Sequence, residues 1–422
     1  MFFFLCVTLA VVNSLPDLSL DYKLSVNGEF EVQLQGASYF QSGPTYLRKD
    51  GRLFTTDDGS LIAHSISDPI EGVDSIGDYI RREILWTLKG DSLNFTTAIQ
   101  RYASEGVLVM EQYFPYGVNK TASPSSNPAD DVTSAWPSFA LDPNDVSRAV
   151  VGWGGRFLEG SHALAWGDAA AKGLPSAGQH GGPMCLFDKQ YNNSVVVSSL
   201  TQHAVSTSSL EKGKGSSAPS YLSYGLLGSI TSIPAGFTLR TVISAEQGGP
   251  SAGMYRWGSI VRKYHDLPAR PYDFTLDYLG YGTDNGQYYY YSPEKDANGK
   301  PKSYEDTLLD VMADAKLRDI PYRYIQLDSW WYPQGKGGGV VDWVATNKSF
   351  PHGLEWFHEQ VKVPFYAHNR MWAAENVYAK QNGGAYDFIV EPWNQLAIPV
   401  EQTFWDDLLA NASDWGMLVY EQ

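Results

Sequence analysis

The chain has 422 residues, of which 47 are Asp or Glu and 31 are Lys or Arg, giving a formal net charge of −16 at pH 7. Its 43% hydrophobic and 14% aromatic residues predict a globular protein large enough for two domains, and they exclude a disordered or coiled-coil chain. Because an acidic surface repels phosphate groups, we expect neither a nucleic-acid partner nor an anionic membrane, and a neutral ligand is favoured.

The first fourteen residues indicate a secretory signal segment. Residues 1–14 are almost wholly apolar and end at the small residue Ser14. The run is too short to cross a bilayer, and no later stretch supplies roughly 18 consecutive apolar residues, so we expect no stable membrane insertion. Cleavage after Ser14 would remove Cys6 and leave Cys185 as the single cysteine. A lone cysteine excludes an intramolecular disulfide and a multi-cysteine metal site.

A secretory route also agrees with five N-glycan acceptor patterns along the chain. They predict glycosylation at Asn94, Asn119, Asn192, Asn347 and Asn411. The expected location is therefore outside the cell or in the lumen of lysosomes or other endomembrane compartments, while the oligomeric state stays open.

The next part of the chain has the pattern of a β-sandwich. From about residue 22 to 245 the apolar residues alternate with period two, and Gly, Pro, Asn or Asp interrupt them every ten or so residues. This pattern predicts a β-sandwich domain over residues 15–250. The spacing becomes helical between Met254 and Tyr264, which predicts a linking helix over residues 251–270.

Strand-like and helical segments alternate in the last part of the chain, residues 271–422. Predicted strands at 275–282, 324–327, 363–368, 386–390 and 416–420 are interleaved with predicted helices at 304–318, 354–361 and 400–410. Such alternation is typical of parallel βα units. These strands are too few for a closed eight-stranded barrel, and a doubly wound sheet is the other interpretation of the same pattern.

Polar and aromatic residues stand at the ends of these strands. Asp284, Asp328 and His368 end or directly follow three of them. In parallel βα folds, side chains at the carboxyl ends of strands converge on one site. Carboxylate, imidazole and guanidinium groups bond sugar hydroxyls, while flat aromatic rings cover the apolar face of a pyranose. The predicted residues for binding an oligosaccharide or glycoside are Asp284, Asp328, Trp330, Trp331, His368, Arg370 and Trp372.

Each of these residues also has a structural interpretation. Asp328 is then a buried carboxylate beside two core tryptophans, and His368 and Arg370 each have a structural ion-pair or hydrogen-bond role with other residues. The eight histidines never fall three or four residues apart, so no helix-borne zinc pair is available, and no dinucleotide fingerprint follows a strand. We therefore predict no metal site and no cofactor.

Four motifs carry a resemblance to a known family: Thr283-Asp-Asn-Gly, Leu327-Asp-Ser-Trp-Trp, His368-Asn-Arg and the closing Trp415-Gly-Met-Leu-Val-Tyr-Glu-Gln422. With the preceding β-domain and helix, the chain resembles the retaining glycoside hydrolases of the α-galactosidase and raffinose-synthase clan. The resemblance implies an N-terminal β-sandwich followed by the first half of a (β/α)8 barrel, strands 1 to 4. It also implies that the turn holding Asp328 binds sugar hydroxyls, although Ser329-Trp330 replaces the commoner Asp-Gly of the clan.

The same resemblance implies that the catalytic carboxyls lie outside this chain. The clan's nucleophile follows the fourth strand in a Lys-x-Asp pattern, which sets Glu421 at the lysine position and the Asp one residue beyond Gln422. The clan's acid/base, from the sixth strand, is also absent. Half a barrel would expose a sheet edge and an unfilled interior. We therefore expect a C-terminally truncated chain, inactive by itself, from a retaining α-glycosidase of the α-galactosidase type.

Retention needs two carboxyls roughly 5 to 5.5 Å apart. Glu421 is the only carboxylate at the end of the predicted fourth strand, so it is the fallback candidate for the catalytic nucleophile, and a structural glutamate is the alternative. The non-enzymatic alternative for the chain is a secreted sugar-binding pseudoenzyme. A third interpretation is a serine esterase, because Gly249-Pro-Ser-Ala-Gly253 matches the G-x-S-x-G elbow with Ser251 as nucleophile.

Overall fold

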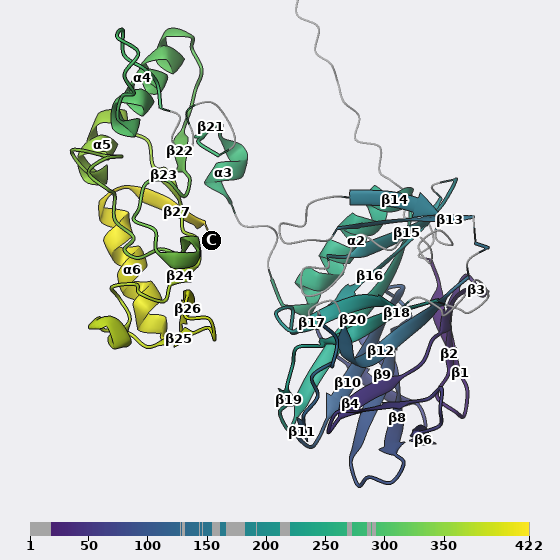
Figure 1. Cartoon of the computed structure of the whole chain (residues 1–422). Helices are drawn as coiled ribbons and strands as arrows, with labels where there is room; N and C mark the ends of the chain where they lie inside the picture. The colour runs from purple at the N-terminus through teal and green to yellow at the C-terminus, as the bar shows by residue number, and fades with distance from the viewer. Residues whose placement is uncertain are drawn as a thin grey trace, which may run out of the picture. The chain divides into compact units, whose positions relative to one another are not determined.

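The computed structural model describes residues 18–126, 128, 131–142, 144–145, 147–153, 161–165, 182–190, 192–211, 220–267, 272–284, 288 and 293–421 (Figure 1). The chain divides into two compact units, Met1–Arg270 (unit 1) and Pro271–Gln422 (unit 2). The predicted signal segment, 1–14, lies outside the described residues. In the part of the chain that the structure describes, no helix has the length and apolarity needed to cross a membrane.

The first sheet of unit 1 is antiparallel, and eight of its strands fall in the described residues. Its order is β1-β2-β3-β12-β18-β17, and β4 pairs with both β12 and β5. The strands are β1 (Leu20–Leu24), β2 (Phe30–Leu34), β3 (Ala37–Ser42), β4 (Tyr46–Lys49), β5 (Arg52–Thr55), β12 (Val132–Leu141), β17 (Ser206–Glu211) and β18 (Ser220–Leu227).

The second sheet of unit 1 has ten described strands in the order β14-β13-β15-β16-β20-β10-β9-β8-β6, and β7 pairs with β8. These are β6 (Leu61–Ile66), β7 (Ile70–Val73), β8 (Asp78–Leu88), β9 (Asn94–Tyr102), β10 (Val107–Phe114), β13 (Arg148–Trp153), β14 (Ser161–Ala165), β15 (Met184–Asp188), β16 (Asn193–Ser199) and β20 (Phe237–Gln247). A separate pair joins β11 (Val118–Asn119) to β19 (Ser232–Ile233).

The inner faces of the two sheets share one hydrophobic core. Strand β2 alternates buried and half-buried residues, so that Phe30, Val32 and Leu34 all point inward. Trp136 of the first sheet and Trp86 of the second are both buried, and their ring centroids lie 6.3 Å apart. Two antiparallel sheets packed face to face in this way form a β-sandwich, which confirms the prediction for this part of the chain.

Helix α2 (Gly249–Tyr264) packs on the outer face of the second sheet. Its Trp257 indole donates to the Ser198 hydroxyl of β16 at 2.7 Å, and Ile260 is buried among apolar residues of β10 and β20. A Cβ at Gly253 would overlap the Ser194 side chain of β16. Glycine at this position therefore lets the helix approach the strand closely.

Unit 2 is built on a parallel sheet with the order β21-β22-β23-β27. Its strands are β21 (Gly280–Gly282), β22 (Tyr324–Leu327), β23 (Phe365–His368) and β27 (Met417–Glu421). The helices are α3 (Phe274–Asp277), α4 (Tyr304–Leu317), η2 (Lys336–Gly338), α5 (Leu354–Val361), η3 (Lys380–Asn382) and α6 (Gln402–Asp414). A small antiparallel sheet contains β24 (Trp372–Ala373), β25 (Phe388–Val390) and β26 (Leu396–Pro399).

The two faces of the parallel sheet differ in character. Ile325 and Leu327 of β22, with Phe365 and Ala367 of β23, join one buried cluster with apolar residues of α4, α5 and α6. The residues between them, such as Gln326, point to the other face because side chains alternate along a strand. Helices therefore cover one face, and polar side chains occupy the opposite face.

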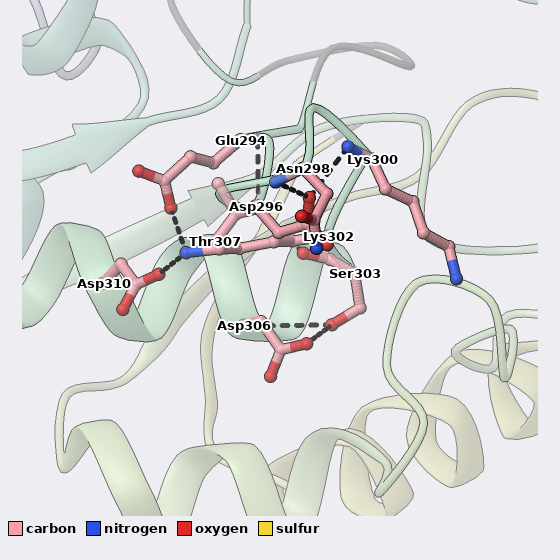
Figure 2. A network of polar contacts seen from close by, with 9 residues as sticks. All are labelled: Glu294, Asp296, Asn298, Lys300, Lys302, Ser303, Asp306, Thr307 and Asp310. Carbon is pink, nitrogen blue, oxygen red and sulfur yellow. Dashed lines mark hydrogen bonds and ion pairs between the residues drawn. The ribbon is translucent and has the colours of Figure 1, made fainter.

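Figure 2 shows how the sequence starts α4. The Ser303 hydroxyl accepts a hydrogen bond from the Asp306 N–H at 3.0 Å and so caps the helix. The Lys302 ammonium bridges the carboxylates of Glu294 and Asp310. This network therefore fixes the segment 294–303, which leads into α4.

Two of the predicted strands differ in the structure. Residues 275–282 were expected to form one strand, but the Asp273 carboxylate accepts from the Thr275 N–H at 2.9 Å and starts the short helix α3, so β21 is only three residues long. The predicted strand at 386–390 pairs antiparallel with β26 as β25 and is not part of the parallel sheet. Period-two alternation does not distinguish the two directions of pairing.

Candidate active site

The carboxyl ends of the parallel strands bring the predicted polar residues together. Asp284 follows β21, Asp328 follows β22, His368 ends β23, and Glu421 ends β27. The four strands are parallel, so their carboxyl ends lie along the same edge of the sheet. Hydrogen bonds from one amide group join two of these side chains, Asp328 and Glu421.

One amide group joins two of the carboxylates. The side-chain nitrogen of Gln326 donates to Asp328 Oδ2 at 3.2 Å and to Glu421 Oε2 at 3.1 Å. Gln326 and Asp328 are buried, with 8% and 5% of their surface exposed. The pair of carboxylates is therefore held by a donor that solvent reaches only slightly.

Thr283 is the hydrogen-bonding centre of this edge. Its hydroxyl donates to the Gln326 carbonyl at 2.9 Å and accepts from the Asp328 N–H at 3.0 Å and from the Trp330 indole at 3.1 Å. Its own backbone N–H donates to Gln326 Oε1 at 2.9 Å. The side chain is fully buried, so the bonds fix the turn that carries Asp328 without solvent competition.

Burial and the charged groups of the edge affect the pKa of the His368 imidazole. Burial lowers its pKa below the ordinary value of 6.5, the carboxylates of Asp328, Glu421 and Asp284 oppose this, and the Arg370 guanidinium reinforces it. The net lowering favours the neutral ring. In that form Nδ1 can accept from the Tyr332 hydroxyl, which lies 2.9 Å away.

Arg370 is held beside the turn that follows β22. One guanidinium nitrogen, Nη2, donates to the Ser329 hydroxyl at 3.3 Å, and its backbone N–H donates to the Tyr332 hydroxyl at 3.1 Å. The glycine loop 335–339 lies alongside, because a Cβ at Gly338 would come within 3.3 Å of Arg370 Nη1. Gly337 and Gly338 have φ angles of 68° and 74°, which glycine adopts without strain.

The tryptophans expected to contact a sugar are core residues in this structure. Trp331 and Trp372 are both 0% exposed, and Trp330 is 6% exposed. The Trp330 ring stacks on Tyr304, with centroids 4.0 Å apart, and also packs on Phe350. These indoles fill the space between sheet and helices, because the residues after β22 and β23 turn back into the core.

Sequence reasoning missed three residues that organise this edge: Gln326, Thr283 as a hydrogen-bonding centre, and Tyr332. A signal existed for the first of them. Gln326 is the single polar residue within the strand Tyr324–Leu327, and a buried polar group in a strand requires partners. The contacts of Tyr332 depend on how a turn folds back, which the sequence pattern does not encode.

The other predicted sites are placed as follows. Asn119, Asn192, Asn347 and Asn411 are exposed, and Asn94, at the start of β9, is half-buried. Ser251 is exposed on the first turn of α2, and the described hydrogen bonds do not join it to a histidine or a carboxylate. Within the described residues, no group of three or more His, Cys, Asp or Glu side chains could hold a metal ion.

A hollow of about 540 Å³ in unit 2 lies away from these residues. Its lining includes Tyr281, Tyr322, Glu294 and Asp310, and none of the predicted site residues is among the lining. Tyr281 of β21 pairs with Ile325 of β22 and packs on the same buried cluster, so it points to the helix-covered face of the sheet. The hollow and the polar edge are therefore on different sides of the sheet.

Comparison with known proteins finds similarity at the level of fold. No protein-family model and no curated protein matches the chain. A structure of the α-N-acetylgalactosaminidase NagBb from Bifidobacterium bifidum in complex with Gal-NHAc-DNJ matches 96% of this chain and 68% of its own, with a TM-score of 0.56 and 10% identity. The GalNAc complex of NagBb matches 94% and 67%, with a TM-score of 0.52 and 11% identity.

An α-galactosidase, AgaA from Geobacillus stearothermophilus, also matches, over 95% of this chain and 56% of its own, at 11% identity and a TM-score of 0.48. The chain thus spans about two thirds of the length of NagBb and little more than half of AgaA. At these identities the comparison with NagBb shows a shared fold. The chain has a fold similar to that of a glycoside hydrolase of known structure.

Proposed function

We propose that unit 2 binds a sugar at the carboxyl edge of its parallel sheet, and that the chain is part of a retaining α-glycosidase of the α-galactosidase type. The observation that carries the proposal is the convergence of charged and hydrogen-bonding groups from different strands. Asp328 and Glu421 share the Gln326 amide, and both act on the same His368 imidazole. Separate strands supply these groups, so their meeting at one edge is a property of the fold.

The chemistry of the edge suits a neutral, hydroxyl-rich ligand. Carboxylates accept strong hydrogen bonds from hydroxyl groups, and a guanidinium such as that of Arg370 donates them. Glu421 is the candidate nucleophile of a double displacement, a reaction that needs a second carboxyl close by. Asp284, Asp328, His368 and Arg370 are the proposed sugar contacts, and Trp330, Trp331 and Trp372 support the edge from the core.

The open sheet supports a longer enzyme. In the described residues, β21 and β27 each pair with one strand of the parallel sheet, so both outer strands keep an unpaired edge. Further βα units on these edges would complete a (β/α)8 barrel and cover the polar face. We therefore assign hydrolysis to a longer chain that contains those units, and sugar binding to the chain described here.

Secretion is part of the same proposal. Four of the five N-glycan acceptor asparagines are exposed, and an exposed acceptor is what glycosylation requires. Expression in a secreting eukaryotic cell should give a glycosylated protein that endoglycosidase treatment reduces in mass. An unglycosylated intracellular product would contradict this part of the proposal.

The test measures binding and turnover separately. We would titrate galactose and N-acetylgalactosamine into the purified chain by calorimetry, because NagBb is named for the second sugar and AgaA for the first. Asp328→Ala and Glu421→Gln should each weaken binding about tenfold or more, the effect of losing a charge-assisted hydrogen bond. Asp414→Ala, at an exposed position ending α6, is the matched control and should leave the affinity unchanged.

Turnover would be followed with nitrophenyl α-galactoside and α-N-acetylgalactosaminide, on this chain and on a version extended by the downstream gene sequence. Hydrolysis by the extended version alone supports the proposal. Binding without turnover by both versions would identify a sugar-binding pseudoenzyme instead. If neither sugar bound and an α-glucoside bound equally poorly, the sugar-binding assignment would be wrong.

A further inference from the structure

We propose that Gln326 is a positioning residue that holds the carboxylates of Asp328 and Glu421 together at the sugar-binding edge of unit 2. The inference rests on the proposed function for its sugar, but its geometric part stands by itself. One side-chain nitrogen lies 3.2 Å from Asp328 Oδ2 and 3.1 Å from Glu421 Oε2. Gln326 itself belongs to none of the four sequence motifs.

The orientation of the Gln326 amide follows from its neighbours. Its oxygen Oε1 accepts from the Thr283 backbone N–H at 2.9 Å. The reversed orientation would place the amide NH2 against that N–H and the carbonyl oxygen against two carboxylates, so three hydrogen bonds would become repulsive contacts. The residue is 8% exposed, and water cannot readily compensate such a loss.

The orientation sets the distance between the two carboxylates. The N–H bonds of a planar NH2 group diverge by about 120°, and acceptors lie close to the line of each bond. The oxygens of Asp328 and Glu421, at 3.2 and 3.1 Å from one such nitrogen, are therefore kept apart on either side of the amide and still held at the same edge.

Gln326 acts only through the carboxylates. Its side chain emerges from the middle of β22, below the edge where Asp328 and Glu421 lie, and it is satisfied by three protein groups. Replacing it removes two donors from a pair of like charges, which then repel each other and separate. The expected effect is a loss of sugar affinity with little loss of fold.

A spectroscopic test detects the pair directly and needs no sugar. In the full chain labelled with ¹⁵N-glutamine, the signals lost in Gln326→Met identify the two Nε2 protons. Because each proton faces a different carboxylate, Asp328→Asn should shift mainly one of them and Glu421→Gln mainly the other. If both variants shifted the same proton, or neither variant shifted any, one amide would not bridge the two carboxylates and the proposal would fail.

A binding test then connects the pair to function. Gln326→Met should weaken sugar affinity about tenfold. The matched control is Gln112→Met, since Gln112 is a buried glutamine of unit 1 whose amide donates to the Trp136 carbonyl at 3.0 Å. It should lower the melting temperature and leave the affinity unchanged. Unaltered affinity in a folded Gln326→Met variant overturns the positioning role.

The two proposals can fail separately. Independent proton shifts in a chain that binds no sugar would retain the carboxylate pair and reject the proposed function. Normal sugar binding without those shifts would retain the proposed function and reject the carboxylate pair. A Gln326→Met variant that does not fold leaves the shift measurements on Asp328→Asn and Glu421→Gln to decide, because their reference is the wild-type spectrum.

Discussion

The Gln326 amide donates to Glu421 at 3.1 Å although the strands that carry the two residues are not neighbours. Strand β23 lies between β22 and β27, and adjacent strands are about 4.8 Å apart, so a flat sheet would set the two backbones at roughly 10 Å. The two long side chains therefore meet across β23, on the polar face of the sheet.

The polar edge of the sheet depends on Thr283. Thr283→Val keeps the shape of the side chain and removes the hydroxyl that takes part in three hydrogen bonds. Because the groups left behind are buried, we expect unit 2 to lose about 2 to 4 kcal/mol of stability. Denaturant unfolding followed by tryptophan fluorescence measures the loss.

Thr283→Ser separates the hydroxyl from the methyl group. It retains all three hydrogen bonds and should cost only about 1 kcal/mol, the value of one buried methyl. Equal losses for Thr283→Val and Thr283→Ser would show that packing, and not hydrogen bonding, explains the importance of this residue.

Two glycines of α2 should respond in opposite ways to the same substitution. A Cβ at Gly253 would overlap the Ser194 side chain, so Gly253→Ala should destabilise unit 1 by about 1 to 3 kcal/mol. A Cβ at Gly258 meets nothing within 4 Å, so Gly258→Ala should stabilise the helix by about 0.5 to 1 kcal/mol. Thermal melts of both variants provide the measurement, and two changes of the same sign would refute the close approach of α2 to β16.

The comparison of these glycines also shows what the sequence predicted. The G-x-S-x-G pattern, taken alone, allowed a nucleophilic Ser251, whereas its last glycine is a packing residue. Period-two and helical spacing correctly predicted the sandwich, the segment that forms α2 and the alternation in unit 2, because burial on one face imposes those periods. They did not predict α3, which begins at a capping carboxylate, Asp273.

The sequence pattern predicted which strand ends carry the site residues, but not how the turns after those strands fold. Strand ends identify where side chains such as Asp328 and His368 emerge, and parallel pairing brings those ends to one edge. Whether a side chain after a strand points into solvent or into the core depends on the turn. The Trp331 side chain points into the core and is fully buried. The bond from Gln326 to Glu421 depends on the order β22-β23-β27 in the sheet, which arises from packing over many residues.

In unit 1, one buried carboxylate holds two arginines. Glu111 is nearly buried, and its oxygens lie 2.6 Å from Arg81 and 2.7 Å from Arg240. Glu111→Ala leaves both guanidinium groups without this partner and should cost about 3 to 5 kcal/mol. Glu83→Ala removes a more exposed carboxylate from the same Arg81 and should cost about 1 kcal/mol or less. Chemical denaturation measures the loss of unfolding free energy in each variant. Similar losses for the two variants would contradict the role given to burial.

The last prediction concerns the protonation of His368. Burial lowers its pKa below 6.5, so the folded protein binds this proton less readily than the unfolded chain. This group therefore favours folding above the unfolded pKa, and its contribution is lost as the pH falls through about 6.5 and below.

The carboxylates raise the pKa of His368, so Asp328→Asn should lower it further, whereas Arg370→Gln should raise it. A pH titration of the ring protons by NMR measures both shifts, and His352, whose side chain is 62% exposed, provides an internal reference for changes in the solution. A raised His368 pKa in Asp328→Asn, or a lowered one in Arg370→Gln, would mean that these charges do not face the imidazole, and the common edge of unit 2 would have to be abandoned.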